Sequence, residues 1–374
     1  MRNRAFLLVL FFVSLLSPTD RSIAQSEADS ILKKANRLIY ENPDEAIKIA
    51  STLYNDPAMP VKHKISALLA ISTAYSSKRD YEMVSQTINE IDIFFPQIKE
   101  EKQKINVLNR IGAQFHDLKI YDKAIEYLDE ALLLIDSYQY QDSIQPFLGY
   151  NYIVRGFVYR QQMSCEIALT YFDKAIEAYD KTEENDITNG NMSVCYYNKG
   201  NCLINLDRIK EAETSFLLAI QHAERTAAPT LISFAQKGLA EIKSREGKYI
   251  EAINILNSAL TNAELVGDLI LNRGLYEGLS NNYLALNDWD NYLLYRNQYL
   301  ALLNQTKQSE RKTINQSMYR LTQTRAEEIE DFHTVFQPLQ IGLLVLFLLL
   351  LFFLIRFVLL SEKKLKKLER TLKS

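Results

Sequence analysis

Residues 193–226 read SVCYYNKGNCLINLDRIKEAETSFLLAIQHAERT, and their pattern of small and large side chains occurs twice more in the preceding sequence. Gly200 follows Gly156 by 44 residues, and Gly156 follows Gly112 by the same interval. Alanines occur 12 and 19 residues after each glycine, with one large side chain between them. The three sets are Ala124, Leu128 and Ala131; Ala168, Phe172 and Ala175; and Ala212, Phe216 and Ala219. This internal repeat determines the expected architecture.

Helical spacing places the small and large residues of each unit on two consecutive helices. Small side chains are needed where antiparallel helices approach closely, because a longer one would separate the axes and open a void. Large side chains are expected to fill the gaps between neighbouring helix pairs. The pattern resembles the tetratricopeptide repeat, a helix-turn-helix unit of ~34 residues that stacks into a superhelix. The resemblance implies an all-α superhelical solenoid, and scarce glycine and the absence of alternating β-branched runs agree with it.

About seven repeat units are expected over 27–306. The outer units are weaker matches, and Tyr292 and Tyr299 replace both alanines in the last one, as expected for a capping repeat. Gly247 is expected to form the turn between two helices, and Asn42-Pro43-Asp44 to start another helix. The strongest units are 105–138, 149–182, 193–226 and 233–266, and the weaker ones are 27–60, 65–98 and 273–306.

The N-terminus has the features of a secretory signal peptide. Arg2 and Arg4 precede an apolar run over residues 5–16, and small residues occupy the two positions that signal peptidase reads before a cut after Ala24. The sequence therefore predicts a cleaved signal peptide over 1–24. The alternative is an uncleaved N-terminal anchor, although the apolar run is short for a membrane span.

A second apolar run predicts a transmembrane helix over 338–360. Residues 341–355 carry no charged or hydrogen-bonding side chain, and about twenty residues at ~1.5 Å each match the ~30 Å hydrocarbon layer. The tail, 361–374, holds six basic residues. The positive-inside rule therefore places this tail in the cytoplasm and the repeats on the other side of the membrane.

The segment 307–337 is expected to be a helical stalk between repeats and membrane. It has no glycine, and apolar residues recur along it at Ile314, Met318, Leu321, Ile329, Phe332 and Phe336. In the tail, Leu365, Leu368 and Leu372 continue a short stripe of the same kind. Stalk and span are candidates for a homodimer interface formed by a coiled coil. For the tail, a basic amphipathic helix lying on anionic lipid is the alternative.

Charge and cysteine content limit the function further. Without the signal peptide and the residues from Arg356 onward, 33 basic and 43 acidic residues remain of the 43 and 46 in the chain, a net charge of about −10 that disfavours nucleic acid as a partner. Cys195 and Cys202 are two turns apart on one expected helix, too far for a disulfide. We interpret these two and Cys165 as small buried apolar residues, with a redox role as the alternative.

No motif for catalysis or cofactor binding occurs in the sequence. The four histidines are scattered without a neighbour at metal-ligand spacing, and there is no Gly-rich phosphate loop or Gly-x-Ser-x-Gly elbow. We therefore expect no enzyme activity, no catalytic residue, no cofactor and no metal.

Binding by surface shape remains as the expected function. In the tetratricopeptide family, the first helix of each unit lines a concave groove that holds an extended peptide or a partner helix. The register of the family implies that the groove of this chain is lined by Asn109, Tyr150, Arg160, Tyr197, Asn201, Lys237 and Asn281. An ordinary solvated or inter-repeat contact is the alternative role for each of these residues.

The order of segments resembles the periplasmic input half of bacterial membrane-anchored sensors and regulators. The resemblance implies an inner-membrane protein with periplasmic repeats that binds a peptide or protein, as a receptor or co-receptor in envelope signalling. Residues 361–374 contain no kinase, cyclase or DNA-binding signature. The alternatives are a static scaffold that tethers envelope assembly factors, or a truncated sensor whose output domain lies downstream.

Overall fold

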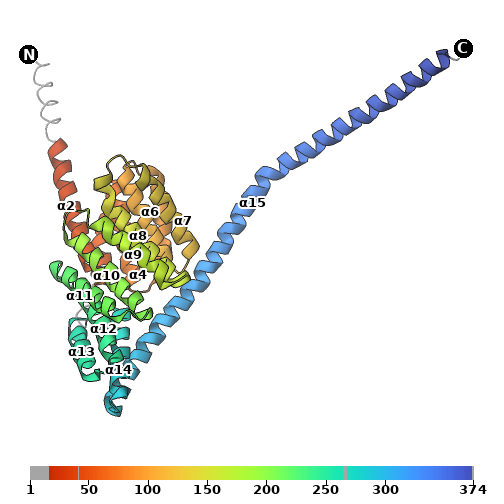
Figure 1. Cartoon of the computed structure of the whole chain (residues 1–374). Coiled ribbons are helices and arrows are strands. Elements are labelled where there is room, and N and C mark those ends of the chain that lie inside the picture. Colours follow the sequence, from red (N-terminus) through yellow and green to blue (C-terminus); the bar gives the residue numbers. More distant parts are fainter. Residues whose placement is uncertain (1–16, 41, 264–267, 373–374) are drawn as a thin grey trace, which may run out of the picture. The chain divides into compact units, whose positions relative to one another are not determined.

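The chain folds as a series of α-helices (Figure 1). The computed structural model describes the backbone of residues 17–40, 42–263 and 268–372, and side chains from residue 26 to 366 apart from 41, 264–267, 309–310, 312–329, 331–333 and 335. No strand occurs within these ranges. The first half contains α2 (Ser17–Leu38), α3 (Pro43–Tyr54), α4 (Val61–Ser77), α5 (Tyr81–Phe94), η1 (Phe95–Gln97), α6 (Glu101–Asp117), α7 (Tyr121–Ser137), η2 (Gln141–Ile144) and α8 (Gln145–Gln162). The second half contains α9 (Cys165–Tyr179), α10 (Asp186–Asn205), α11 (Ile209–Arg225), α12 (Pro229–Arg245), α13 (Tyr249–Ala263), α14 (Leu269–Ala285) and α15 (Trp289–Leu372).

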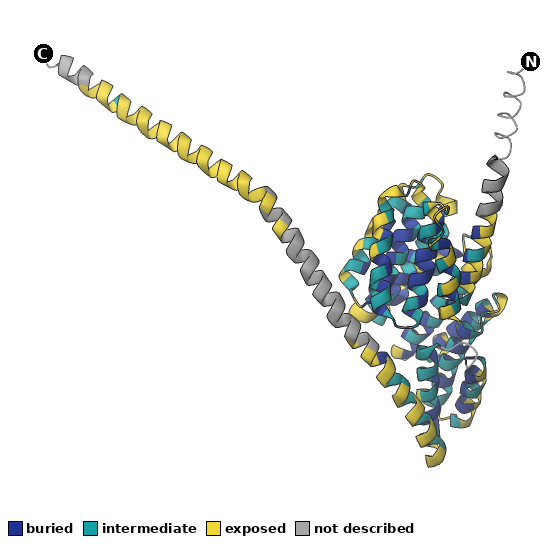
Figure 2. Cartoon of the chain, turned by 180° about the vertical axis from the view of Figure 1, so that it is seen from behind, coloured by how far each residue is buried: buried dark blue, intermediate teal, exposed yellow. Residues whose placement is uncertain are grey.

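These helices form seven consecutive pairs in the described part of the chain, which confirms the expected all-α solenoid of about seven units. The first helices α2, α4, α6, α8, α10, α12 and α14 each contact the next one in this series, and we call them the first-helix layer. The second helices α3, α5, α7, α9, α11 and α13, with the beginning of α15, cover this layer. Buried side chains fill the space between the two layers (Figure 2).

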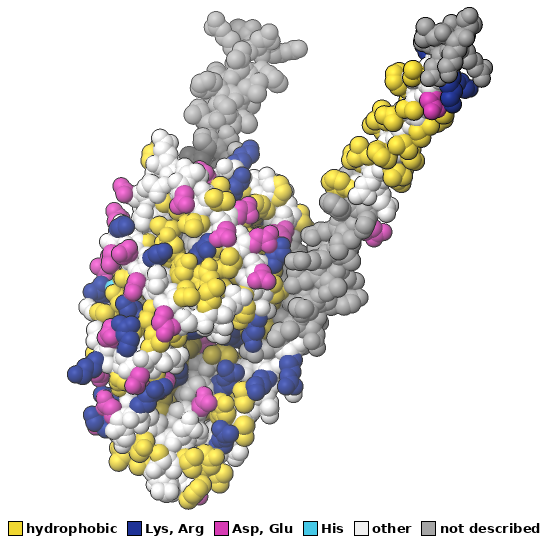
Figure 3. All heavy atoms as spheres, turned by 45° about the vertical axis from the view of Figure 1, so that its right-hand side comes forward, with side chains coloured by type: hydrophobic (Ala, Val, Ile, Leu, Met, Phe, Trp, Pro, Cys, Tyr) yellow, Lys and Arg dark blue, Asp and Glu magenta, His cyan; other side chains and the backbone are white. Residues whose placement is uncertain are grey.

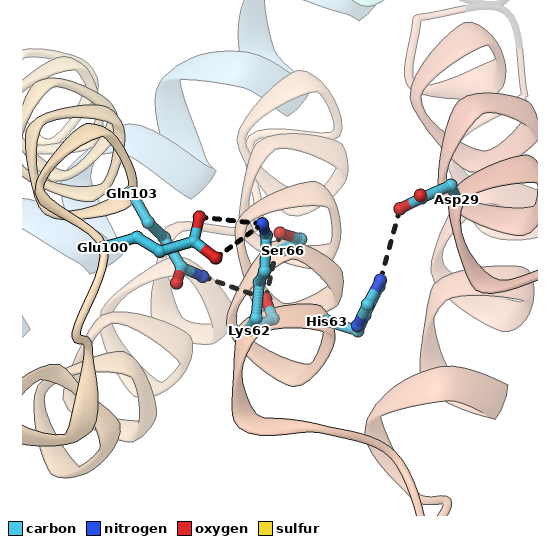
Figure 4. A network of polar contacts seen from close by, with 6 residues as sticks. All are labelled: Asp29, Lys62, His63, Ser66, Glu100 and Gln103. Atoms are coloured by element: carbon cyan, nitrogen blue, oxygen red, sulfur yellow. Dashed lines mark hydrogen bonds and ion pairs between the residues drawn. The ribbon is translucent and has the colours of Figure 1, made fainter. Parts of the chain in front are cut away.

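Polar contacts link the first three members of the first-helix layer near the start of α4 (Figure 4). His63 on α4 is buried, and its Nε2 lies 3.2 Å from Oδ1 of Asp29 on α2. Lys62 Nζ donates to a carboxylate oxygen of Glu100 at 2.8 Å, and Gln103 on α6 donates to the Lys62 carbonyl at 3.1 Å. These contacts fix the spacing of α2, α4 and α6.

The repeated glycines accept the large side chains of the second helices. A Cβ at Gly156 would lie 2.4 Å from the Phe172 ring, and one at Gly200 would lie 2.6 Å from Phe216. Leu128 occupies the same place against Gly112. The flanking alanines of these units are 0% exposed, as expected for sites where two helices approach closely. Phe216 also packs against Gly238 of the following unit, and thus joins two units as well as two helices.

The turns within units share one backbone geometry. In five of them a three-residue turn carries its middle residue in the left-handed region, at Arg79, Lys119, Asp207, Gly247 and Asn287. The following N–H closes the helix by bonding back to the last turn, as Asp80 N does to Tyr75 O and Lys248 N to Lys243 O, both at 2.9 Å. The prediction that Gly247 forms such a turn is confirmed, with φ +76°.

The units are longer than the expected ~34 residues. First helices begin at residues 61, 101, 145, 186, 229 and 269, so each unit spans about 40 to 44 residues. The helix of the strong unit 105–138 begins at Glu101 and that of 193–226 begins at Asp186, because each first helix extends upstream of the repeated pattern. The start of α3 agrees with expectation, since Asn42 accepts the Glu45 N–H at 3.1 Å as its N-cap.

The whole chain divides into two compact parts, Met1–Ile314, which contains the repeat units, and Asn315–Ser374. In the described residues of the C-terminal part, the helical segment Phe336–Lys366 is long and apolar enough to cross a membrane, with a mean hydropathy of 3.2 in its most apolar window. Its side chains from Leu339 to Leu360 are exposed (Figure 2). The stalk is helical, but the side chains of Ile314, Met318, Leu321, Ile329 and Phe332 lie outside the described residues.

The predicted signal peptide lies outside the described residues up to residue 16, and its last part belongs to α2. Downstream of the predicted cut, α2 buries a regular stripe of Ala28, Leu32 and Ala35 against α3 and α4. The buried core of the solenoid begins at this stripe.

Candidate functional site

The first-helix layer carries basic side chains that have neutral partners. None of three such side chains forms an ion pair with a carboxylate of the described residues. Arg110 donates to Thr73 Oγ1 at 2.9 Å, Arg160 donates to Asn198 Oδ1 at 2.6 Å, and Lys237 Nζ lies 6.0 Å from the centre of the Tyr197 ring. Each of these contacts joins two members of the first-helix layer.

Basic residues of the first helices that turn toward the second helices are paired with acids instead. Arg155 bonds Asp129 at 2.5 Å, Lys199 bonds Asp173 at 2.5 Å, and Lys243 bonds Glu213 at 3.0 Å. Each pair joins a first helix to the second helix of the preceding unit. Charge is therefore balanced between the layers, while Arg110, Arg160 and Lys237 keep charge available to a ligand.

Tyr40 lies near several titratable side chains of the solenoid. This tyrosine follows α2 and is 52% exposed, yet burial by the surrounding protein raises the pKa of its hydroxyl to about 12. Tyr150 and the charges of Arg110, Asp117 and Asp268 also act on this hydroxyl.

Asp268 shows how far the first-helix layer curves. It is the N-cap of α14, where its Oδ1 accepts the N–H groups of Ile270 and Leu271 at 2.9 and 2.8 Å. Its charge acts on Tyr40 and on Arg79, which follow α2 and α4. Asp268 is thus near enough to Tyr40 and Arg79 for its charge to influence their ionisation. We call Tyr40, Arg79, Arg110, Asp117, Tyr150 and Asp268 the inner cluster.

Asp117 is held as a carboxylate within this cluster. Burial by itself raises its pKa, but a hydrogen bond from His116 at 3.1 Å, the positive charge of Arg79 and a hydrogen bond from Ser76 outweigh burial and lower it. Arg79 in turn donates to the Tyr81 hydroxyl at 2.7 Å. The acidic part of the cluster is thus bonded internally.

A second group of side chains lies further along the first-helix layer. The Tyr197 ring lies 5.4 Å from Phe234 and 6.1 Å from Phe216, between centres. Lys237 follows on α12 and extends along Gly274 of α14, whose missing side chain leaves room for the lysine stem. Tyr197 and Lys237 together present an apolar ring and an ammonium group on one surface.

The structure places most residues predicted for the groove on the first-helix layer with part of their surface open. Tyr150, Arg160, Tyr197, Asn201 and Lys237 are partly exposed. Asn281 is exposed on α14. The structure brings Tyr150 into the inner cluster and Tyr197 together with Lys237, whereas Arg160 bonds Asn198 of α10.

The prediction for Asn109 is wrong. Its side chain is only 1% exposed, because it faces the next unit rather than the groove. Asn109 donates to the Phe147 carbonyl at 2.9 Å and accepts from Asn151 Nδ2 at 2.8 Å. Asn151 also donates to the Leu128 carbonyl at 2.9 Å and accepts from Arg155 Nε at 2.7 Å. These amides form a buried polar network between units.

The family model for the tetratricopeptide repeat matches residues 194–224. The chain has the tetratricopeptide-repeat fold. No curated protein matches the sequence. Among the described residues there is no group of three or more His, Cys, Asp or Glu side chains that could hold a metal ion.

Several solved tetratricopeptide-type structures share the fold at low sequence identity. A Rap protein complexed with competence and sporulation factor is 16% identical, with a TM-score of 0.53 over 75% of this chain and 78% of that chain. The Rap conjugation gene regulator of plasmid pLS20 in complex with the Phr* peptide is 16% identical, with a TM-score of 0.56 over 75% and 73%. NprR in complex with its cognate peptide NprX is 12% identical, with a TM-score of 0.54 over 87% and 98%.

Sequence reasoning found only Tyr150 of the inner cluster and missed its other five members: Tyr40, Arg79, Arg110, Asp117 and Asp268. Arg110 directly follows Asn109, and one residue turns a helix by about 100°, so the register missed the exposed side chain by one position. Tyr40 and Asp268 lie in turns, to which a register of first helices does not apply. Their proximity depends on the curvature of the whole solenoid.

Proposed function

We propose that the first-helix layer binds a peptide or protein segment that carries carboxylate groups. The observation that carries the proposal is that Arg110, Arg160 and Lys237 have only neutral partners in this layer, while the neighbouring basic residues are paired with acids. Tyr40, Tyr150 and Tyr197 add apolar area with a polar tip, which suits an extended peptide. Three of the structures with the same fold hold a peptide or peptide factor, which supports this choice of ligand.

The same proposal includes anchoring of the chain in a membrane. The apolar segment Phe336–Lys366 and the basic residues after it support a single span with a cytoplasmic C-terminus. In this arrangement the solenoid lies in the periplasm of a bacterial inner-membrane protein, with the span at 338–360. The chain then acts as a receptor or co-receptor that passes ligand binding to a separate cytoplasmic partner.

Peptide retention by the immobilised full chain tests the ligand class. The probe is a pool of random peptides rich in Asp and Glu with free C-termini, compared with an amidated pool in which Gln and Asn replace the acids. Loss of a charge-assisted hydrogen bond costs about 1.5–3 kcal/mol, so Arg110→Ala and Lys237→Ala should each weaken retention of the acidic pool about tenfold or more. The matched control is Arg208→Ala, which removes an exposed arginine bonded to Glu211 on α11.

The acidic pool should be retained more strongly than the amidated pool, and the control variant should bind as the parent chain does. Equal retention of the two pools would reject carboxylate recognition. Unchanged retention by both Arg110→Ala and Lys237→Ala would show that the ligand binds outside the first-helix layer.

A further inference from the structure

Two cysteines far apart in sequence lie side by side in the solenoid. Cys165 is the first residue of α9, and Cys202 is on α10 in the following unit. Both belong to the core cluster that surrounds Phe172 and Phe216. Asn205, one turn after Cys202 on the same helix, donates its amide to Cys165 Sγ at 3.7 Å.

Burial and the nearby Cys165 thiol both raise the pKa of the Cys202 thiol. The end of α10 therefore brings Cys202 and Asn205 to the start of α9, where Cys165 lies. Cys195, the third cysteine, is two turns earlier on α10 and belongs to a different core cluster, with Tyr179 and Met192. The fold thus selects one pair from the three thiols.

The two paired thiols differ in accessibility. Cys202 is 0% exposed, and burial raises the pKa of its thiol well above the usual range. Cys165 is only partly buried. A disulfide reagent that approaches from solvent therefore meets Cys165 first, since thiol-disulfide exchange depends on access as well as on the thiolate.

We propose that Cys165 and Cys202 form a structural disulfide that joins α9 to α10 when the solenoid lies in an oxidising compartment. The inference rests on the proposed placement of the solenoid outside the cytoplasm, where disulfides persist. The oxidant is a small-molecule or protein disulfide.

The reaction consists of two exchange steps. The Cys165 thiolate attacks the oxidant disulfide, which forms a mixed disulfide and releases one oxidant thiolate. The Cys202 thiol then loses its proton and attacks Cys165 Sγ, which forms the Cys165–Cys202 bond and releases the second oxidant thiolate. Both thiolates take up the protons lost by the cysteines, so that one disulfide is reduced to two thiols while the protein pair is oxidised.

The bond would join two units at the middle of the first-helix layer. Arg160 is on α8, which pairs with α9, and Tyr197 is on α10. A covalent link between α9 and α10 would fix the spacing of the two candidate ligand-binding side chains. It would also restrict the unfolded chain by closing a loop of about 37 residues, which raises stability.

Thiol mapping on the purified full chain tests the geometry. The chain is reduced in detergent micelles, exposed to oxidised glutathione, quenched with acid, alkylated under denaturing conditions and digested for mass spectrometry. The expected product is a linked pair of peptides that contain Cys165 and Cys202, with Cys195 alkylated. The Cys195→Ser variant should keep this product, and its melting temperature should rise by several degrees on oxidation, whereas Cys165→Ser should show neither effect.

A stable glutathione adduct on Cys165 with Cys202 still free would overturn the proposal, because it would mean that the thiols cannot reach bonding distance. Alkylation in intact cells distinguishes whether the two thiols can form a bond from whether the solenoid lies outside the cytoplasm. The pair should be oxidised before cell lysis. If it oxidises when purified but is fully reduced in cells, the placement outside the cytoplasm is wrong and the disulfide does not form in vivo. Peptide retention by the first-helix layer is measured independently of both results.

Discussion

At the scale of single residues, the solenoid is built from glycines that are complementary to large side chains. Phe172 and Phe216 are 0% exposed, and their rings occupy the space that a side chain at Gly156 or Gly200 would need. Each glycine and its large partner are 16 residues apart in sequence. Because this contact is local within one unit and recurs along the chain, the fold could be predicted without knowledge of any distant contact.

Gly156 and Gly190 offer a matched test of this complementarity. Gly156→Ala places a Cβ 2.4 Å from the Phe172 ring, whereas Gly190→Ala meets nothing within 4 Å on its helix. Overpacking costs about 1–3 kcal/mol, and alanine recovers up to about 1 kcal/mol of helix propensity. Denaturant unfolding should therefore show Gly156→Ala less stable by about 1–2 kcal/mol and Gly190→Ala unchanged or slightly more stable. Equal stabilities of the two variants would contradict the assigned packing.

At the scale of helices, buried amides join neighbouring units. Asn151 on α8 is 0% exposed and bonds Asn109 of α6, the Leu128 carbonyl of α7 and Arg155 of its own helix. The register of the family predicted a binding role for Asn109, because a polar residue on a first helix suits a groove. The sequence alone cannot show that a second buried asparagine, 42 residues later, takes up this amide instead.

Replacement of the central amide should weaken the stack between α6 and α8. Asn151→Leu leaves the Leu128 carbonyl, Asn109 Oδ1 and Arg155 Nε without their present partner. Buried polar groups that lose a partner cost about 1–3 kcal/mol each, so thermal unfolding should show a total loss of at least about 3 kcal/mol. Asn201→Leu is the control, since Asn201 is partly exposed and has no hydrogen bond among the described side chains. An equal loss of stability in Asn201→Leu would contradict the specific role of Asn151 in joining the units.

At the scale of the whole molecule, the candidate site depends on curvature that no local pattern encodes. The charge of Asp268 at the start of α14 acts on Tyr40, although the two residues are 228 positions apart in sequence. The helix register therefore found Tyr150, Arg160 and Lys237 but could not find the turn residues. On the face of the solenoid drawn in Figure 3, acidic and basic side chains are interspersed. The candidate site differs from the rest of the surface because its basic side chains, Arg110, Arg160 and Lys237, have neutral partners.

A reporter fusion tests the proposed topology of the chain. Six basic residues follow the predicted span in the tail 361–374, and the positive-inside rule retains such a tail in the cytoplasm. A fluorescent protein that folds only in the cytoplasm should therefore be active after Ser374, and alkaline phosphatase, which requires export, should be inactive there. The opposite pattern of activity would invert the proposed orientation.

The two ends of the helix pairs differ in what they could accept during the evolution of this protein. Turns within units are short and closed by the left-handed residue and its backbone bond, so extra residues there would break the close approach of glycine and ring. Connections between units vary in length, from three residues at 226–228 to six or seven at 95–100 and 138–144, which contain η1 and η2. We therefore expect insertions of loops or whole domains in the connections between units, along one edge of the stack. Related proteins should differ in length mainly at that edge.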